Sequence, residues 1–370
     1  MRAFGIITSS GNHIYVEGMQ DYRSIGAFSF LGRYRAIDFP MSNMSNSGIE
    51  HVSVLMSNNP RSLVEHLGSG RHYNINSKRG KVQLLFTEGS AATSFYNTNM
   101  TGFAQNIESI QKAPADYVVI APGYMIYTQD YNKLLDKHIE LGCDITLLYH
   151  SVETANEDFL NCDVLSLNRQ KGVDAIAKNR GAEASAKVFM DTYIMKKSLF
   201  LELISKARSI SSMYTLAQIV NKYCSELDVR GIEHEGYFAT LTDFKSVYKA
   251  NMSLIDYKTA KTLFSKNWPV YTRTSDSCPT QYFEEAEIKS SVVSNGCLIQ
   301  GYLENCVVGR GCTIGKDCVI KNCVISSDVI IADGTHLENL IVDKHARVLH
   351  TKEIVADPEN PGYVKRGDII

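Results

Sequence analysis

Four features are absent from this 370-residue sequence, and each absence argues against a class of protein. No apolar run is long enough to cross a membrane, and the N-terminus lacks the basic start and long apolar core of a signal peptide. We therefore expect a cytoplasmic protein. The formal net charge is only −2, so the charge does not favour nucleic acid or an anionic membrane as a partner. None of the nine cysteines lies in a C-x-x-C pair, which favours buried, reduced thiols over disulfides or a zinc site.

The length and the order of segments indicate two domains. A chain of 370 residues is too long for one ordinary hydrophobic core. Over residues 1–255, strand-like segments such as Phe4–Ile7, His51–Met56 and Tyr117–Ala121 alternate with helix-like segments such as Tyr131–Leu141. This alternation predicts a doubly wound α/β domain with a mostly parallel sheet.

From about Ala286 the hydrophobic period changes to six residues. Two series show this spacing, namely Val308, Ile314, Ile320 and Cys306, Cys312, Cys318, Val324, Ile330. Hexad repeats of this kind predict a left-handed parallel β-helix, and Ala286–Val348 is long enough for roughly three coils. The same spacing explains the cysteines as small residues that face the inside of the coils. Residues 256–285 then form a connector, and residues 286–370 form the β-helix and a C-terminal tail.

The segment after the first predicted strand, Ser9–Tyr15, stands where an α/β protein usually binds a nucleotide phosphate. Such a loop needs several glycines, so that backbone N–H groups can approach the phosphate oxygens, and usually a cation. This segment contains one glycine, two serines, an asparagine and no Lys or Arg. It has the position of a catalytic loop and few of the residues that such a loop requires.

Longer motifs resemble one known family. Residues Gly32–Asn43 read G-R-Y-R-A-I-D-F-P-M-S-N, which resembles the G-K-Y/F-R-I-I-D-F-x-L-S-N signature of bacterial glucose-1-phosphate adenylyltransferase, also called ADP-glucose pyrophosphorylase. Asn46–Ile49, Trp268–Thr274 and Leu337–Lys344 agree with the same family. The resemblance covers nearly the whole chain. It implies an α/β nucleotidyltransferase domain, Rossmann-like with a mostly parallel sheet, followed by a short left-handed parallel β-helix.

The positions that carry catalysis in that family are degenerate in this sequence. They are Ser9, Ser10, Asn12, Ile14, Ile25, Tyr124 and Thr240. The resemblance places the phosphate-binding arginine on Ile14, a lysine of catalytic chains on Ile25, and the two magnesium-binding aspartates on Tyr124 and Thr240. Nucleotidyl transfer depends on Mg²⁺ held by carboxylates and on cations that clamp the triphosphate. Because losing one such contact costs about 10²–10³ in rate, the combined losses predict an inactive or very weak chain.

This pattern resembles the GlgD-type regulatory subunit that assembles, in some bacteria, with a catalytic subunit. The resemblance implies a non-catalytic partner that modulates a catalytic glucose-1-phosphate adenylyltransferase subunit in glycogen biosynthesis, in a hetero-tetramer or by self-association. We expect no cofactor on this chain, with Mg²⁺ held by the catalytic partner. Two alternatives stay open: an active adenylyltransferase with an atypical site, and a module that senses a sugar phosphate or another phosphorylated effector.

Three cationic residues are candidates for ligand binding. The resemblance places Arg33 where catalytic homologues bind an anionic effector with a lysine, and Arg35 matches the adjacent arginine. Two guanidinium groups one residue apart can hold a phosphate, although Arg35 can equally pair with Asp38 and serve only the fold. Lys178 aligns loosely with the family's sugar-phosphate lysine, but the flanking Glu and Pro are missing.

Some histidines and tyrosines have weaker functional interpretations. His336 and His345 lie in the predicted β-helix, where acyltransferases carry a histidine base, but neither has a recognisable acyltransferase context. Tyr124 and Tyr127 can be interpreted as a stacking platform for adenine. We instead expect Tyr124 to fill the volume left by an absent metal and nucleotide.

Overall fold

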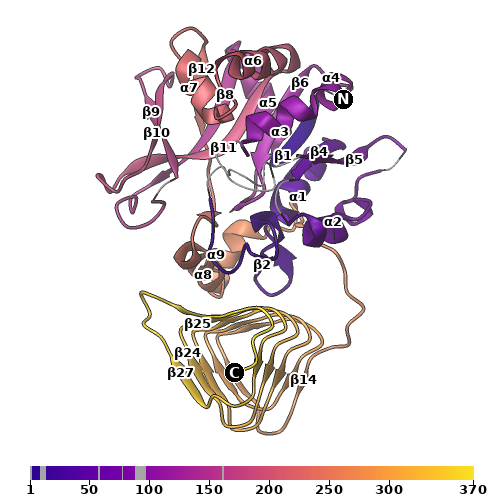
Figure 1. Cartoon of the computed structure of the whole chain (residues 1–370), viewed down its shortest axis with the longest axis vertical. Helices are drawn as coiled ribbons and strands as arrows, with labels where there is room; N and C mark the ends of the chain where they lie inside the picture. Colours follow the sequence, from indigo (N-terminus) through magenta and orange to yellow (C-terminus); the bar gives the residue numbers. More distant parts are fainter. Residues whose placement is uncertain (1, 9–13, 57–58, 77, 88–96, 161) are drawn as a thin grey trace.

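The protein consists of a helix-covered sheet and a stack of short coils. The computed structural model describes residues 2–8, 14–56, 59–76, 78–87, 97–160 and 162–370. Figure 1 shows the sheet and its helices above the coiled stack. The two predicted architectures are therefore confirmed. Within the described residues, no helix is long and apolar enough to cross a membrane.

The sheet of the first part has nine strands in a mixed, mostly parallel arrangement. They are β1 (Ala3–Thr8), β4 (His51–Met56), β5 (Lys81–Phe86), β6 (Tyr117–Pro122), β8 (Ile145–Val152), β9 (Asp163–Leu167), β10 (Val173–Lys178), β11 (Ala186–Lys196) and β12 (Val229–Glu233). Strand β1 lies between β4 and β6 and is parallel to both. Strand β11 is antiparallel to β6 and β8. The position of β1 between two parallel neighbours places its carboxyl end, Thr8, away from the margins of the sheet.

Helices lie between the strands of this sheet and after its last strand, and some of them begin at a capping side chain. The helices are α1 (Asp38–Asn46), α2 (Arg61–Leu67), α3 (Asn99–Gln105), α4 (Ile107–Gln111), α5 (Tyr131–Leu141), α6 (Lys197–Ile210), α7 (Leu216–Tyr223), α8 (Phe244–Ser253) and α9 (Tyr257–Leu263). The side chain of Asp130 accepts hydrogen bonds from two backbone N–H groups at the start of α5. Thr215 and Gln218 form a capping box at the start of α7. Local capping thus reproduces the predicted ends of α5.

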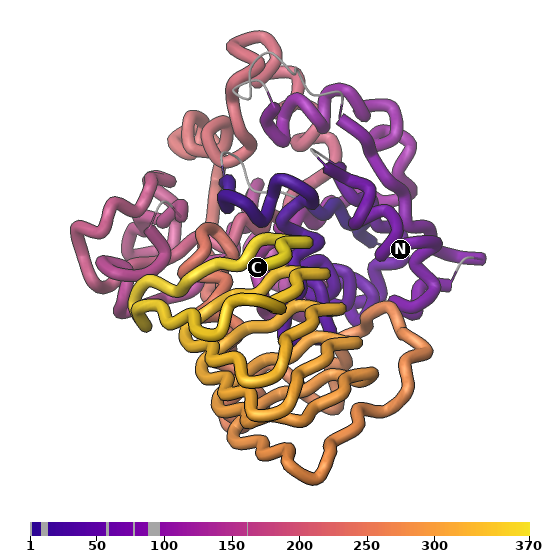
Figure 2. The backbone as a smooth tube through the Cα atoms, turned by 60° about the horizontal axis from the view of Figure 1, so that its bottom comes forward, coloured from indigo at the N-terminus to yellow at the C-terminus, as the bar shows by residue number. Residues whose placement is uncertain are grey.

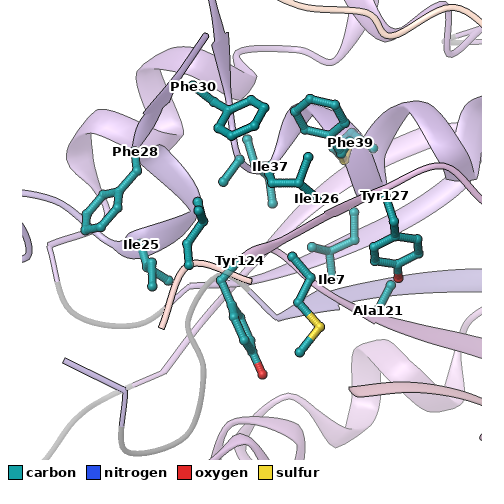
Figure 3. Close-up of a cluster of buried hydrophobic side chains, with 14 of the residues drawn as sticks. Ile7, Ile25, Phe28, Phe30, Ile37, Phe39, Ala121, Tyr124, Ile126 and Tyr127 are labelled. Carbon is teal, nitrogen blue, oxygen red and sulfur yellow. The ribbon is translucent and has the colours of Figure 1, made fainter. Parts of the chain in front are cut away.

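Two separate hydrophobic cores lie on opposite faces of the sheet. Alternate residues of β1 divide between them, with Phe4 and Ile6 in one core and Ile7 in the other. Figure 3 shows the core that contains Ile7, with Tyr124 at its edge and the phenol oxygen directed away from the phenylalanine rings. The same core extends to Val307 and Val324 of the coiled stack, so the two parts of the chain share one core.

The coiled stack is a parallel β-helix of three five-stranded sheets. Its strands are β14 (Gln281–Tyr282), β17 (Leu298–Ile299), β20 (Thr313–Ile314), β23 (Ile330–Ile331) and β26 (Arg347–Val348); β15 (Glu287–Lys289), β18 (Tyr302–Glu304), β21 (Val319–Lys321), β24 (His336–Glu338) and β27 (Glu353–Val355); and β16 (Val292–Val293), β19 (Val307–Val308), β22 (Val324–Ile325), β25 (Leu340–Val342) and β28 (Gly362–Val364). The stack is deeper than the roughly three coils that we predicted, and that prediction was wrong. Most successive coils pair residues 15 or 17 apart, such as Val292 with Val307 and Val307 with Val324, so these coils are shorter than three full hexads. The last coil is longer, because Leu340 pairs with Gly362.

Asparagine side chains occupy equivalent positions of neighbouring coils, and cysteines recur at every sixth residue along one coil. Asn305, Asn322 and Asn339 have positive φ angles of 53°, 49° and 57°. Their side chains form a ladder, in which Asn305 Nδ2 donates to Asn322 Oδ1 at 2.7 Å and Asn322 Nδ2 donates to Asn339 Oδ1 at 3.1 Å. The predicted inward-facing cysteines Cys306, Cys312 and Cys318 are buried. The hexad series is therefore a packing pattern, as predicted.

The connector runs along α1 and fixes the β-helix to the sheet domain. The indole Nε1 of Trp268 donates to Asn43 Oδ1 at 2.9 Å. The backbone N–H of Tyr271 donates to Ser42 Oγ at 2.8 Å. Two of the sequence motifs that carried the family resemblance are thus in direct contact.

A buried ion pair joins the start of the chain to the last coils. One guanidinium nitrogen of Arg23 lies 2.8 Å from each carboxylate oxygen of Asp343, and both side chains are almost inaccessible to water. Tyr363 donates its phenol hydrogen to the same carboxylate at 2.8 Å. In Figure 2 the yellow C-terminal coils lie against the indigo N-terminal segment. We call Arg23 and Asp343 the junction pair.

Candidate functional site

One cavity of about 180 Å³ opens at the edge of the sheet, and we call it the sheet pocket. Residues from the loop after β1, from β9 to β11 and from α7 line it, including Ile14, Tyr124, Asp163, Lys178 and Asp191. Its position beside the end of β1 is the one that the sequence assigned to a phosphate site. The structure therefore brings Ile14, Tyr124 and Lys178, three of the predicted positions, into one cavity.

The two positions aligned with metal aspartates are neighbours in the structure. Strand β13 (Phe238–Thr240) pairs with β7 (Met125–Tyr127), and this register places Thr240 opposite Met125, next to Tyr124. The backbone N–H of Leu241 donates to the carbonyl oxygen of Tyr124 at 3.0 Å. Both Tyr124 and Thr240 are buried. Their proximity is what two halves of one metal site require, so the residue alignment is spatially consistent.

A carboxyl group that the sequence analysis does not identify, that of Asp191, lines the sheet pocket. Asp191 accepts a hydrogen bond from the phenol of Tyr193 at 2.9 Å and another from the phenol of Tyr124 at 3.2 Å. Burial of the carboxyl group raises the pKa of Asp191 to about 7, with a further contribution from the charge of Asp163. Asp191 has a φ of 43°, in a β-bulge of β11. The bulge interrupts, at this residue, the regular alternation of side chains between the two faces of the sheet.

Lys178 lies in the sheet pocket, but its charge is already compensated. Its Nζ atom lies 2.9 Å from Asp163 Oδ1 on the neighbouring strand β9. The lysine side chain is 49% exposed, so the pair is in contact with water. A sugar phosphate would therefore meet a lysine that is paired with a carboxylate.

The remaining degenerate positions fall into two groups. Ser9, Ser10 and Asn12 lie outside the described residues. Ile25 is fully buried in the short 3₁₀ turn η1 (Ile25–Ala27) and packs in the core that contains Ile7. It does not line the sheet pocket, so a cation at position 25 would require a change in this core.

A second cavity, of about 410 Å³, lies between the sheet domain and the β-helix, and we call it the basic pocket. Its cationic lining residues are Arg33, Arg35, Arg273, Arg310 and Lys344. Only one carboxylate, that of Asp276, is among the residues that line it. The cations come from three segments far apart in the sequence, namely the turn before β3 (Tyr34–Arg35), the connector and the coils. Such an excess of positive charge around a cavity favours an anionic ligand.

The turn that carries Arg33 is fixed from two sides. Gly32 has a φ of 67°, and a Cβ atom there would lie 2.7 Å from the carbonyl oxygen of Val308 in the β-helix, so only glycine fits. On the other side, the buried carboxylate of Asp38 accepts hydrogen bonds from the backbone N–H of Arg35 at 2.8 Å and from Tyr73 at 2.6 Å. The guanidinium group of Arg35 donates to the carbonyl oxygen of Ser62 at 2.6 Å.

His66 completes the support of this turn, because its Nε2 atom lies 2.6 Å from Asp38 Oδ1. Burial alone would raise the pKa of Asp38, but the charge and hydrogen bond of His66 hold it below its usual value. The predicted contact between Arg35 and Asp38 exists through the backbone, and the guanidinium group remains on the lining of the basic pocket.

Positive charges in the basic pocket perturb one another. Burial, followed by the charges of Arg35 and Arg23, lowers the pKa of Lys344 to about 7. Burial, followed by the charge of Arg33, lowers the pKa of Arg310. The buried Nε atom of Arg310 has no hydrogen-bond partner among the described residues. Both pKa values are lowered, and a bound anion would raise them again, because a negative charge stabilises each protonated group.

Comparison with known proteins places the chain among nucleotidyl transferases. Residues 22–256 match the nucleotidyl transferase family, and residues 278–363 match the GlmU-like C-terminal hexapeptide family. A glycogen biosynthesis protein GlgD from Geobacillus stearothermophilus is 31% identical over 86% of this chain and 83% of its own length. The chain belongs to the family of GlgD proteins and glucose-1-phosphate adenylyltransferases.

Other members of this family show similar levels of identity. A GlgD protein of Bacillus subtilis is 28% identical over 95% of this chain and 93% of its own length. A glucose-1-phosphate adenylyltransferase of Clostridium perfringens is 30% identical over 81% of this chain and 77% of its own length. The similarity therefore spans both parts of the fold and includes both kinds of relative.

The residues at the family's metal position do not fit Mg²⁺. A neutral phenol and a hydroxyl group stand at Tyr124 and Thr240, whereas Mg²⁺ is usually bound through carboxylates. Burial raises the pKa of Tyr124 well above its usual value, which keeps the phenol neutral. The nearby carboxyl group of Asp191 is occupied by two phenol donors. Among the described residues, no group of three or more His, Cys, Asp or Glu side chains is placed to hold a metal ion.

The sequence interpretation missed most of the basic pocket. Arg33 and Arg35 were identified as candidates, whereas Arg273, Arg310 and Lys344 were not. The signal was present, because Arg273 and Lys344 belong to the motifs Trp268–Thr274 and Leu337–Lys344. The structure brings these two motifs and Gly32–Asn43 together around one cavity. His336 and His345 lie on the β-helix, where His336 contacts Glu353 and His345 contacts Asp328.

Proposed function

We propose that this chain is a non-catalytic regulatory subunit of glucose-1-phosphate adenylyltransferase. It modulates a catalytic subunit that makes ADP-glucose from ATP and glucose 1-phosphate for glycogen biosynthesis. The observation that carries this proposal is the proximity of Tyr124 and Thr240, since Thr240 pairs with Met125 and Leu241 N–H donates to the carbonyl oxygen of Tyr124. Both metal carboxylates are replaced at one place, and the adjacent Ile14 supplies no cation. Electrostatic stabilisation is usually the largest single term in such catalysis, so its removal leaves little activity.

The basic pocket supports the regulatory half of the proposal. Five cations surround a cavity that is lined by both parts of the fold. A bound anion would raise the lowered pKa of Lys344. We assign a phosphorylated effector to this pocket, with Arg33 and Arg35 as its first contacts. Because the pocket lies between the sheet domain and the β-helix, a bound effector changes the strength of the contact between these two parts. A change of that kind can reach a partner subunit across either surface.

The proposed partner is a catalytic glucose-1-phosphate adenylyltransferase subunit, in a hetero-tetramer, and that partner holds the Mg²⁺. The β-helix offers two outward-facing sheets for this assembly, because its third sheet packs on the sheet domain. Short solenoids commonly use such faces and their open ends for contacts with other subunits.

Two measurements test this proposal. The purified chain, given ATP, glucose 1-phosphate and Mg²⁺, should form ADP-glucose at a rate at least 10³-fold below that of a catalytic subunit, by the loss per contact given above. Co-expression with the catalytic subunit of the same organism should give a hetero-oligomer with altered kinetics. Arg33→Gln with Arg310→Gln should keep the assembly and lose the response to phosphorylated effectors. Ordinary rates from the chain alone, or no change in the mass and rate of the partner, would overturn the proposal.

A further inference from the structure

The turn Leu31–Arg33, which we call the Arg33 turn, has a rare backbone conformation. Leu31 has a φ of 47°, and Gly32 follows it with a φ of 67°. The backbone N–H of Arg33 donates to the carbonyl oxygen of Leu31 at 2.8 Å, so Gly32 is the central residue of a three-residue turn with a positive φ. Such turns are strained, and the left-handed region is also unfavourable for a bulky residue such as Leu31. The surrounding structure must therefore hold this turn in place.

Helix α8 supplies the group that binds the first residue of the Arg33 turn. The backbone N–H of Leu31 donates to the Oδ1 atom of Asn251 at 2.8 Å, across 220 residues of sequence. The Nδ2 atom of Asn251 donates to the carbonyl oxygen of Val247 at 2.8 Å, one turn back in the same helix. These two bonds fix the orientation of the amide group. Leu31 is 8% exposed and Asn251 is 1% exposed, so bulk water does not compete for the bond between them.

The helix itself gives no reason for an asparagine at this position. Asn has a lower helix propensity than Ala or Leu, and the other buried residues of α8 are Val247, Tyr248 and Ala250. A buried amide costs free energy unless hydrogen bonds replace those that it made with water. The bond from Leu31 provides this compensation on the acceptor side. An apolar residue at position 251 would leave the N–H of Leu31 buried and without this acceptor.

The Arg33 turn determines where two cations of the basic pocket lie. Arg33 is the last residue of the turn, and it lines the pocket. The carbonyl oxygen of Arg33 accepts a hydrogen bond from the guanidinium group of Arg310 at 3.4 Å. If the turn relaxed to negative φ angles, both the Arg33 side chain and this carbonyl oxygen would move. Asn251 is not among the described residues that line the basic pocket, so it acts on a ligand there only through the turn.

We propose that Asn251 is a positioning residue for anion binding in the basic pocket. Its amide oxygen holds Leu31 at a positive φ, and this conformation places Arg33 and Arg310 around the same anion. The inference deepens the proposed function and rests on it, since it assumes an anionic ligand in the basic pocket. It adds a residue on α8 that contacts no ligand and still sets the affinity. The positive charge of the pocket is then necessary for anion binding and not sufficient.

The test is a calorimetric titration of the purified full-length chain with inorganic sulfate. Asn251→Leu keeps the approximate volume of the side chain and removes the acceptor of the Leu31 N–H. We expect the dissociation constant to rise by about tenfold or more, because sulfate must then hold the turn with a buried donor unpaired. Asn251→Ala leaves room for a water molecule beside this N–H, so its dissociation constant should lie between those of the parent and Asn251→Leu. Neither variant changes the net charge.

Val247→Ala is the matched control for stability. Val247 is buried in the same helix, and its truncation destabilises the fold without removing the acceptor of the Leu31 N–H. Urea unfolding should show a loss of stability in both Val247→Ala and Asn251→Leu, whereas only Asn251→Leu should lose affinity for sulfate. Equal losses of affinity in the two variants would overturn the inference, because affinity would then follow stability.

A double-mutant cycle with Leu31→Gly separates positioning from a general structural role. Glycine adopts a positive φ at little cost, so the turn then depends less on the bond to Asn251. In the Leu31→Gly background, Asn251→Leu should therefore raise the dissociation constant by less than about threefold. The same loss in both backgrounds would overturn the inference, and so would a parent-like affinity of Asn251→Leu alone. These outcomes concern the chain by itself, whereas the regulatory function fails if the catalytic partner does not respond to effectors. The two failures are therefore distinguishable.

Discussion

The sheet pocket and the basic pocket differ in both charge and construction. The sheet pocket, of about 180 Å³, is built within one domain and holds two carboxyl groups and one paired lysine. The basic pocket, of about 410 Å³, is built by three distant segments and holds five cations with one carboxylate. In a nucleotidyl transferase the site beside the first strand must attract phosphates. Among the described residues that line the pocket beside β1, the one cation is paired with a carboxylate, whereas five cations line the pocket at the domain junction. The difference supports the proposal that this chain recognises an anion at a site other than the one beside the first strand.

The largest expected effect comes from breaking the ion pair between Arg23 and Asp343, because the basic pocket depends on this contact and the sheet pocket does not. Arg23→Met leaves the carboxylate of Asp343 buried and without its cation, which should lower the free energy of unfolding by about 3–5 kcal/mol. Urea unfolding measures this loss, and phosphate binding should weaken with it, because Lys344 follows Asp343 directly. The double variant Arg23→Met with Asp343→Leu removes both charges and should recover most of the stability. If Arg23→Met were as stable as the parent protein, the prediction that the junction pair stabilises the fold would be wrong.

The second prediction concerns affinity for inorganic sulfate. Replacing Arg33 and Arg310 with Gln should weaken sulfate binding by about ten- to a hundredfold, because hydrogen bonds to charged groups contribute about 1.5–3 kcal/mol. Calorimetric titration measures this change, with Arg169→Gln, an exposed residue outside the pocket, as the matched control. If the control loses as much affinity as the double variant, sulfate is bound by net charge alone.

The two pockets should also respond to pH in opposite ways. The pKa of Asp191 is raised from 3.8 to about 7, so the folded chain holds an extra proton between these values, and stability falls as pH rises through that range. The pKa of Lys344 is lowered from 10.5 to about 7, so the unfolded chain holds the extra proton and stability rises with pH above 7. Each slope is at most about 1.4 kcal/mol per pH unit. Asp191→Asn should remove the first slope and Lys344→Met the second, as measured by denaturation from pH 4 to 10.

The same titration of Lys344 should appear in ligand binding. As pH rises from 6 to 8, Lys344 loses its proton and the basic pocket loses one charge, so the affinity for sulfate should fall. Sulfate is the suitable probe because its own charge is constant over this range. Lys344→Arg keeps the positive charge at all these pH values and should abolish most of the dependence. A dependence that survives this substitution would point instead to His66, which also lines the pocket.

The smallest expected effect belongs to the exposed ion pair of the sheet pocket. Lys178→Gln removes the partner of Asp163, and because the lysine is 49% exposed the free energy of unfolding should change by less than about 1 kcal/mol. Thermal unfolding in low and high salt measures this change. A large loss of stability would mean that Lys178 has a structural role that its exposure does not indicate.

Periodicity predicted the fold well and the sites only in part. Alternating segments and hexads are local patterns, so the α/β domain and the β-helix could be predicted, as could the inward-facing cysteines. The depth of the β-helix could not, because coils of 15 and 17 residues shift the hexad register. Asp191 was missed because its place in the pocket depends on a bulge in β11. Arg310 was missed because it meets Arg33 only through tertiary packing, across 277 residues.

The junction pair also constrains how this protein is made. Arg23 and Asp343 are separated by 320 residues, so at bacterial or eukaryotic elongation rates roughly 16–64 s of synthesis pass between them. During that time the strands of the sheet domain can pair with one another. Arg23, which will lie at the junction with the β-helix, has no counter-ion until Asp343 is made. Only the last coils to leave the ribosome supply the carboxylate and the phenol that receive it. The C-terminal coils therefore complete the N-terminal domain, and a chain that stops short of them presents a site for chaperones or proteases.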